Sequence, residues 1–254
     1  MWQGTIAVAQ RILCELCRRR RSLILWAIFP VFILLLNVAI LEERTQLSLA
    51  EAYKLATPLT IVGAALFFSC LGGTVSTVVA EREQQTIKRL FLSPLSGLGY
   101  FLGIFLAHSL IGVGQTLIVF TMAVVAGAKF EGSIALVVLV IALSILAYVG
   151  CGFILGTQIA KRTEDVNALI ATFGVPLLLL GGSFIPAEFF PANLKEIALW
   201  NPVYHINELL AGVLQDRAWS DISHHFTFLL AFALVMVVGA WLSYNQMRER
   251  ERHL

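Results

Sequence analysis

Six long apolar stretches, none of which contains Asp, Glu, Lys or Arg, alternate with shorter polar segments along the chain. A helix needs roughly 20 apolar residues to cross about 30 Å of hydrocarbon, and each stretch is close to or above that length. We therefore predict an all-α integral membrane protein with six transmembrane helices, forming one domain over residues 1–254. The predicted spans, one to six, are residues 22–41, 55–80, 100–127, 133–157, 166–184 and 226–244.

Residues 1–21, which precede the first span, alternate apolar and polar positions with a helical period. At 100° per residue, Trp2, Ile6 and Ile12 share one face and Arg11 lies opposite. Four consecutive arginines end the segment. A basic amphipathic helix is typical of the headgroup plane, although an ordinary surface helix has the same pattern. We predict an N-terminal amphipathic helix at the membrane interface.

The composition supports a membrane location, because 58% of the 254 residues are hydrophobic and 13% are charged, against about 25% charged in a soluble domain. The distribution of Lys and Arg sets the orientation. With a cytoplasmic N-terminus, thirteen of the 18 basic residues lie inside and five outside. We therefore expect a multi-pass protein of the cell membrane, inner or plasma, with both termini in the cytoplasm. The outside residues are Arg44, Lys54, Lys129, Lys195 and Arg217.

The sequence lacks the residue patterns of an ATP site or a catalytic centre. A Walker loop needs a Lys followed by Ser or Thr, and none of the five lysines has one. Patterns of metalloproteases and serine hydrolases are also absent. We expect no catalytic residue, no metal ligand and no cofactor bound by this chain. These absences disfavour a membrane enzyme.

An ion-coupled carrier usually places a charged side chain at membrane depth. The predicted spans hold none, and His108 in span three is the nearest candidate for a proton relay. A lone His is more often a packing residue. The energy source is therefore expected on a partner protein.

The inner segment that follows span two, residues 81–92, predicts a short helix with acidic residues first and basic residues later. Ile87, Leu90 and Phe91 fall on one face of that helix, and Ser93-Pro94 ends it. The segment is either a docking helix for a cytoplasmic protein or a solvated helix whose apolar side chains dip into the interface.

The external segment 181–210 is too apolar for a solvated loop and too interrupted by proline for a span. We expect short re-entrant helices here, between spans five and six, acting as a gate over a pathway or as a static lid. The residues assigned to this gate are Glu188, Phe189, Phe190, Trp200 and Tyr204.

The inner segment reads Ala-Glu-Arg-Glu-x-x-Thr-x-x-x-Leu and ends in Ser-Pro-Leu-Ser, and the external segment reads Phe-x-Pro, Pro-x-x-Leu and Asn-Pro-x-x-x-Ile. With the order of spans, these motifs resemble ABC type-2 (ABC-2) transporter permeases over essentially the whole chain, in particular the drug- and antibiotic-exporter branch. The chain departs from the family at Gln85, where Gly is frequent, and at Tyr204-His205, where Thr-Tyr is common. These departures weaken any inference about the substrate.

The resemblance implies a half-transporter that pairs with a second permease copy and two separate ATP-binding cassette ATPases, which bind ATP and Mg²⁺. Membrane lipid surrounds such a permease, and no nucleic acid is involved. The first inner loop would contact the ATPase, through Glu81, Arg82, Glu83, Thr86, Lys88, Arg89, Leu90 and Phe91.

The expected activity is export of a hydrophobic or amphiphilic molecule, such as a drug, an antibiotic or a lipid-like compound. Export of a lipid-linked polysaccharide is the alternative with the same architecture. Polar and aromatic positions in the spans are the candidates for the substrate path: Asn37, Phe67, Phe68, Ser69 and Phe184.

Overall fold

The computed structural model describes residues 2–18, 20–86 and 96–252, and these residues form helices and turns without any strand. Six of the helical segments are long and apolar enough to cross a membrane, which confirms the predicted fold class. The spans, one to six, are α2 (Arg20–Thr45), α3–η1–α4 (Leu49–Thr60, Ile61–Gly72, Gly73–Glu83), α6 (Gly97–Val125), α7–η2 (Ile134–Ile154, Leu155–Ile159), α8–η3–α9 (Thr163–Leu169, Ile170–Gly174, Val175–Leu180) and α12 (Trp219–Arg252).

Most of the helices extend beyond the predicted spans, because hydropathy marks only the part of a helix suited to hydrocarbon. The C-terminal helix α12 gains more than a turn at each end from polar residues. Span five differs at both ends, beginning at Thr163 and stopping at Leu180. It stops early because Gly181 and Gly182 follow, and Gly182 adopts a left-handed φ of +82° that ends the helix.

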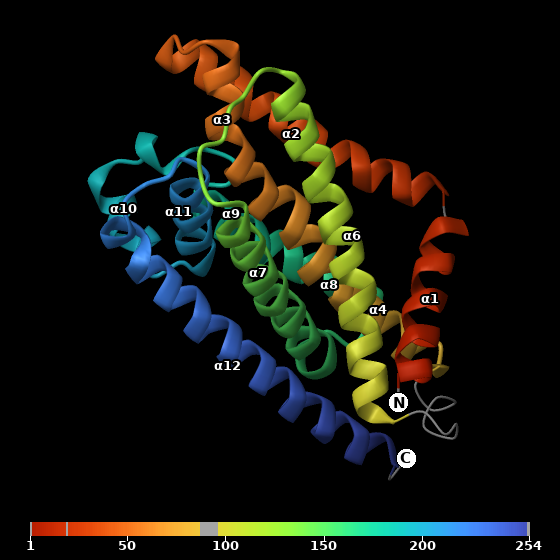
Figure 1. The fold of residues 1–254 in the computed structure, drawn as a ribbon. Coiled ribbons are helices and arrows are strands. Elements are labelled where there is room, and N and C mark those ends of the chain that lie inside the picture. Colours follow the sequence, from red (N-terminus) through yellow and green to blue (C-terminus); the bar gives the residue numbers. More distant parts are fainter. Residues whose placement is uncertain (1, 19, 87–95, 253–254) are drawn as a thin grey trace.

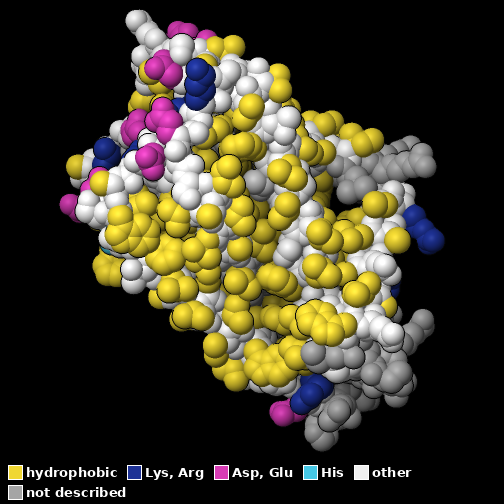
Figure 2. Space-filling view, in the orientation of Figure 1, with side chains coloured by type: hydrophobic (Ala, Val, Ile, Leu, Met, Phe, Trp, Pro, Cys, Tyr) yellow, Lys and Arg dark blue, Asp and Glu magenta, His cyan; other side chains and the backbone are white. Residues whose placement is uncertain are grey.

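Span two is the centre of the bundle. In its most apolar stretch 83% of the residues are buried, against 17% in span five. Both termini lie at one end of the bundle, near the end of α4, whereas α10 (Ala192–Ala198) and α11 (Pro202–Leu214) lie toward the other end (Figure 1). We call these the inner end and the outer end. Hydrophobic side chains cover the middle of one face between charged groups at its edges (Figure 2).

The N-terminal helix α1 (Trp2–Arg18) packs beside the inner half of α6 (Figure 1). Its buried face is Thr5, Val8, Ala9 and Ile12, while Trp2 stays exposed. This buried face is rotated from the predicted apolar face of the helix, because α6 covers only one edge of that apolar face. Exposed apolar groups such as Trp2 remain available to lipid.

Two glycines, Gly103 and Gly152, allow neighbouring helices of this chain to approach closely. A Cβ atom at Gly103 would stand 2.6 Å from the Cβ of Val8, and one at Gly152 would stand 2.6 Å from the carbonyl oxygen of Leu71. The lack of a side chain at Gly103 therefore lets α1 pack closely on α6, and the lack of one at Gly152 lets span two pack closely on span four.

The outer segment is held to the bundle by side-chain amides. Asn207 of α11 donates to the Gly181 carbonyl at 2.7 Å and to the Ser183 hydroxyl at 2.9 Å. Asn37 of span one donates to the Ser183 carbonyl at 3.1 Å, and Asn201 donates to the Leu177 carbonyl at 2.7 Å. The turn after span five is thus fixed from both sides, because its buried backbone groups need partners.

Candidate functional site

Three consecutive residues at the inner end of span two, Glu81, Arg82 and Glu83, contact three different parts of the bundle. A helix turns about 100° per residue, so consecutive side chains point in different directions. We call these three residues the inner brace.

Glu81 is 7% exposed and faces α1 and α6. Its carboxylate pairs with the Arg11 guanidinium and accepts a hydrogen bond from the Tyr100 hydroxyl. A buried carboxylate is costly without such partners. Glu81 therefore joins α1 to spans two and three, and its side chain faces the bundle rather than the inner surface.

Arg82 lies against the inner end of span four. Its Nη1 donates to the carbonyl oxygens of Gly156 at 3.0 Å and Ala160 at 3.2 Å. The last carbonyls of a helix have no partner within the helix and carry partial negative charge. Arg82 thus caps the end of η2.

Glu83 is exposed and caps the start of span five. Its carboxylate accepts from the Thr163 amide at 3.1 Å and from the Thr163 hydroxyl at 2.6 Å. A negative charge at a helix N-terminus is favourable. Asp165 accepts from the Lys161 amide at 2.8 Å and so orders the same turn. The two inner loops, 81–86 and 160–165, therefore form one connected surface.

The expected contacts of the first inner loop are only partly within the described residues. Thr86 is half-buried at the end of the described segment, next to the exposed Gln85. Gln85 has a left-handed φ of 54°, which glycine adopts without strain. Four of the predicted contact residues lie outside the described residues: Lys88, Arg89, Leu90 and Phe91.

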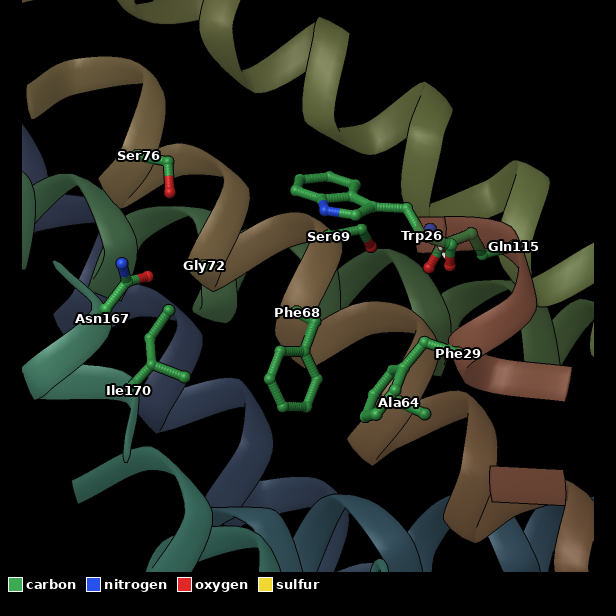
Figure 3. A pocket seen from close by; sticks show the side chains of 10 residues that line it. All are labelled: Trp26, Phe29, Ala64, Phe68, Ser69, Gly72, Ser76, Gln115, Asn167 and Ile170. Carbon is green, nitrogen blue, oxygen red and sulfur yellow. Dashed lines mark hydrogen bonds between the residues drawn. The ribbon is translucent and has the colours of Figure 1, made fainter. Parts of the chain in front are cut away.

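A pocket of about 320 Å³ lies between spans one, two, three and five (Figure 3). Its aromatic wall includes Phe29 and Phe68, whose ring centroids are 4.8 Å apart. We call it the polar pocket, because several of its side chains are neutral hydrogen-bonding groups and none is charged. Its lining residues are Trp26, Phe29, Ala64, Phe68, Ser69, Gly72, Ser76, Gln115, Asn167 and Ile170.

Gln115 is the amide that approaches this pocket from span three. Its Nε2 donates to the Trp26 carbonyl at 3.2 Å. Its Oε1 is buried and has no hydrogen-bond partner among the described residues. A buried acceptor without a partner costs free energy, so this oxygen is suited to receive a donor from a ligand.

The structure brings only some of the predicted path residues together. Phe68 and Ser69 line the polar pocket, whereas Phe67 faces the opposite side of span two. Asn37 holds the outer turn, and Phe184 packs against the hydrophobic core. Sequence reasoning missed the other eight lining residues, among them Trp26, Gln115 and Asn167. Amides within apolar runs were the available signal for two of them, since such groups seldom face lipid.

His108 lies beside this pocket and is engaged at both ring nitrogens. Its Nδ1 lies 3.0 Å from the Ser69 carbonyl oxygen, and its Nε2 lies 2.9 Å from the Thr77 hydroxyl. Gly73 leaves space for the ring, because a Cβ there would stand 2.6 Å from His108 Nδ1. These contacts favour a packing and hydrogen-bonding role over a proton relay.

The predicted gate residues are spread over the outer segment, which contains η4 (Ala187–Phe189), α10 and α11. Glu188, Phe189 and Trp200 are exposed, with Trp200 at 87%. Phe190 and Tyr204 are half-buried. The five side chains do not converge on one opening, and their role as a gate stays a prediction.

The residue after Tyr204, His205, links α11 to the last span. Burial lowers the pKa of His205 below its usual value, so the ring is neutral near pH 7. Its Nε2–H donates to the Leu199 carbonyl at 2.9 Å, and its Nδ1 therefore accepts from Nδ1–H of His225 at 2.7 Å. This pair fastens the outer helices to the start of α12.

Comparison with known proteins agrees with this architecture. The chain is 29% identical over 181 residues to the inner membrane transport permease YhhJ of Escherichia coli (strain K12), and equally to YhhJ of Shigella flexneri. That alignment covers 70% of this chain and 47% of the relative. It is 27% identical over 150 residues to "Probable multidrug ABC transporter permease YbhR" of E. coli K12, covering 59% of this chain and 40% of the relative.

The chain thus spans about half the length of the curated relatives that it matches. Residues 36–242 match the family model described as ABC-2 family transporter protein. This match includes spans two to five completely, most of span six, the last part of span one, and the inner brace. The protein is a multi-pass membrane protein that belongs to the ABC-2 transporter family.

Proposed function

We propose that this chain is the permease subunit of an ATP-driven exporter and that separate ATP-binding cassette ATPases supply the energy, binding the ATP and Mg²⁺. The observation that carries this proposal is the inner brace. It joins the segment that would dock on an ATPase to α1, to the end of span four and to the start of span five.

The brace has a mechanical consequence for the polar pocket. Glu83 holds the amide and hydroxyl of Thr163, and Asn167 follows one helical turn later on the same span. Asn167 and Ile170 form the span-five wall of the polar pocket. A partner that displaces the segment after Glu83 would therefore move this wall relative to Phe68 on span two.

Mutation of the brace tests the coupling. The tagged full-length permease is purified with its co-expressed ATPase and reconstituted, and ATP hydrolysis and the amount of bound ATPase are measured. Glu83→Ala should lower hydrolysis several-fold while leaving expression and membrane insertion intact. Glu188→Ala removes another exposed carboxylate, at the outer end, and serves as the control. Unchanged ATPase binding and hydrolysis in Glu83→Ala would contradict the proposed coupling.

A second copy of the chain is the proposed partner within the membrane. Span five is the least buried span and also the least hydrophobic, with a mean hydropathy of 1.4 in its best window. Its exposed face carries small residues at helical spacing, Ala168, Ala171 and Thr172, beside the exposed Asn167. Such a face suits close contact with another helix better than contact with lipid.

Disulfide trapping tests this dimer. In a background without the native cysteines, Ala171→Cys should give an oxidised dimer in native membranes. Val238→Cys is the control, because Val238 of α12 is 58% exposed and lies on another face of the bundle. Equal trapping at both positions, or none at Ala171→Cys, would argue against span five as the interface.

The transported molecule is proposed to be hydrophobic or amphiphilic. The polar pocket has aromatic walls and uncharged hydrogen-bonding groups, and the relative YbhR is named as a probable multidrug ABC transporter permease. The proposed setting is the cell membrane, with the inner end facing the cytoplasm.

A further inference from the structure

A second and larger pocket, of about 550 Å³, lies on the other side of span two. Its walls come from spans two, four, five and six and from the start of α11. Its polar side-chain groups are the Tyr148 hydroxyl and the Cys151 thiol, and no charged residue lines it. We call it the apolar pocket. Its volume lies within the range of about 300–1,000 Å³ that is common for ligand sites.

The apolar pocket opens sideways from the bundle. Ile159 and Phe173 line it and are 53% and 65% exposed, so they form its rim. Phe173 lies in the middle of span five and Ile159 is the last residue of span four, so the opening extends from membrane depth to the inner end of the bundle. An uncharged, apolar wall at that depth suits a hydrocarbon chain, since a polar group placed there would lose its hydrogen bonds.

The two pockets lie back to back and share one wall residue, Ile170. The adjacent residues Phe67 and Phe68 face the apolar pocket and the polar pocket respectively. Ile170 packs onto Gly72, where a Cβ atom would stand 3.2 Å from Ile170 Cδ1. Ile170 therefore closes the gap between spans two and five that separates the pockets.

All three π-helical segments of the described chain border these pockets. Ile170 and Phe173 belong to η3, Phe67 and Phe68 to η1, and Leu155 to η2. π-helical turns inside α-helices are rare and occur frequently at functional sites. The irregular helix geometry of the bundle is therefore concentrated around the two pockets.

We propose that the apolar pocket takes up the hydrocarbon chain of a neutral amphiphile from the bilayer, and that the polar end of the same molecule binds in the polar pocket after Ile170 is displaced. The proposal deepens, and rests on, the proposed export function. A neutral head group fits because Ser69, Ser76, Gln115 and Asn167 offer hydrogen bonds without a charge. Bilayer phospholipids carry charged head groups, which these side chains would not balance.

The test uses the full-length permease, without ATPase, in phosphatidylcholine nanodiscs. The probe is dodecyl β-D-glucoside with a photoreactive diazirine at the end of its chain, and labelled residues are mapped by mass spectrometry. Label is expected on walls of the apolar pocket such as Tyr148 and Phe173, and excess unlabelled dodecyl glucoside should remove it. A phosphatidylcholine with the same diazirine should label these residues at least fivefold less.

Filling the apolar pocket with a larger side chain should prevent the photoreactive glucoside from labelling its walls. Cys151→Trp places a large side chain on the wall and is expected to reduce labelling at least tenfold. Val235→Trp adds the same side chain at a lipid-facing position of α12 that is 62% exposed, and should label as wild type does. Because Cys151→Trp could perturb folding, the competition in the wild-type protein provides a readout that needs no variant.

A second pair of variants tests the link between the pockets. Gln115→Leu and Asn167→Leu remove hydrogen-bonding groups from the polar pocket and should each lower labelling in the apolar pocket several-fold. Equal labelling by the glucoside and the phosphatidylcholine would overturn the proposal in favour of a bilayer-lipid site. Wild-type labelling in both leucine variants would also overturn it, because chain and head would then bind independently.

This experiment separates the site from the energy source. It requires no ATPase. A wild-type permease that is labelled as expected, but neither binds an ATPase nor stimulates its hydrolysis, would refute the proposed function alone.

Discussion

Removing Arg11 should release α1 from the bundle, because Arg11 compensates the buried carboxylate of Glu81. We consider Arg11→Met, which keeps most of the apolar side chain and removes the charge. Glu81 remains 7% exposed in the native packing and keeps the Tyr100 hydroxyl as a hydrogen-bond donor. The carboxylate then lacks its countercharge.

The magnitude follows from the burial of the two partners. Breaking a buried pair by removing one member costs about 3–5 kcal/mol. The Arg11 side chain is 36% exposed, against 10% for Glu81. Since solvent weakens a partly exposed pair, we expect about 2–3 kcal/mol for Arg11→Met. Exchanging both members, as Arg11→Met with Glu81→Gln, should cost about 1 kcal/mol or less, because no buried charge remains.

Amide hydrogen exchange of residues 2–18 measures the effect locally. A loss of about 2–3 kcal/mol in the free energy that holds α1 in place corresponds to amide exchange roughly 30- to 150-fold faster in α1. The double variant should exchange within about tenfold of wild type. The reasoning fails if the α1 amides of Arg11→Met exchange as slowly as those of the wild type, or if those of the double variant exchange faster than those of Arg11→Met.

Three further predictions concern topology, packing and the outer turn. Single-cysteine labelling should reach position 249 from the cytoplasm and position 188 from outside, and labelling of position 188 only from the cytoplasm would contradict the orientation. Gly103→Leu should displace α1, because a Cβ there already meets Val8 at 2.6 Å, and protease cleavage within α1 should increase. Asn207→Leu leaves the Gly181 carbonyl without its 2.7 Å partner and should cost about 1–3 kcal/mol in thermal unfolding; unfolding at the wild-type temperature would exclude that role.

The sequence predicted the six spans because charge-free apolar runs of sufficient length have few alternatives to crossing a membrane. It could not predict the exact ends of these helices, since polar residues such as Ser220 and Asn245 continue α12 beyond the hydrocarbon stretch. The early end of span five depends on a backbone conformation at Gly182 that hydropathy does not report.

The candidate site was less accessible from the sequence, because it depends on tertiary contacts. The Glu-Arg-Glu motif was visible, but the partners of these side chains are distant in sequence, with Arg11 on one side and Thr163 on the other. The motif was predicted to contact the ATPase directly. The structure places Glu81 within the bundle and leaves Glu83 at the surface, and the contact with the ATPase stays a prediction.

The inner brace also makes this part of the chain intolerant of changes in length. One residue inserted between Ala80 and Glu81 would rotate every following side chain by about 100° about the helix axis. Glu81 would turn away from Arg11, Arg82 from the end of span four, and Glu83 from Thr163, all in a single step. Substitution at one of the three positions removes one contact, whereas an insertion or deletion removes three at once. Length variation among related chains should therefore be rare just before this motif and should accumulate after it, beyond residue 86.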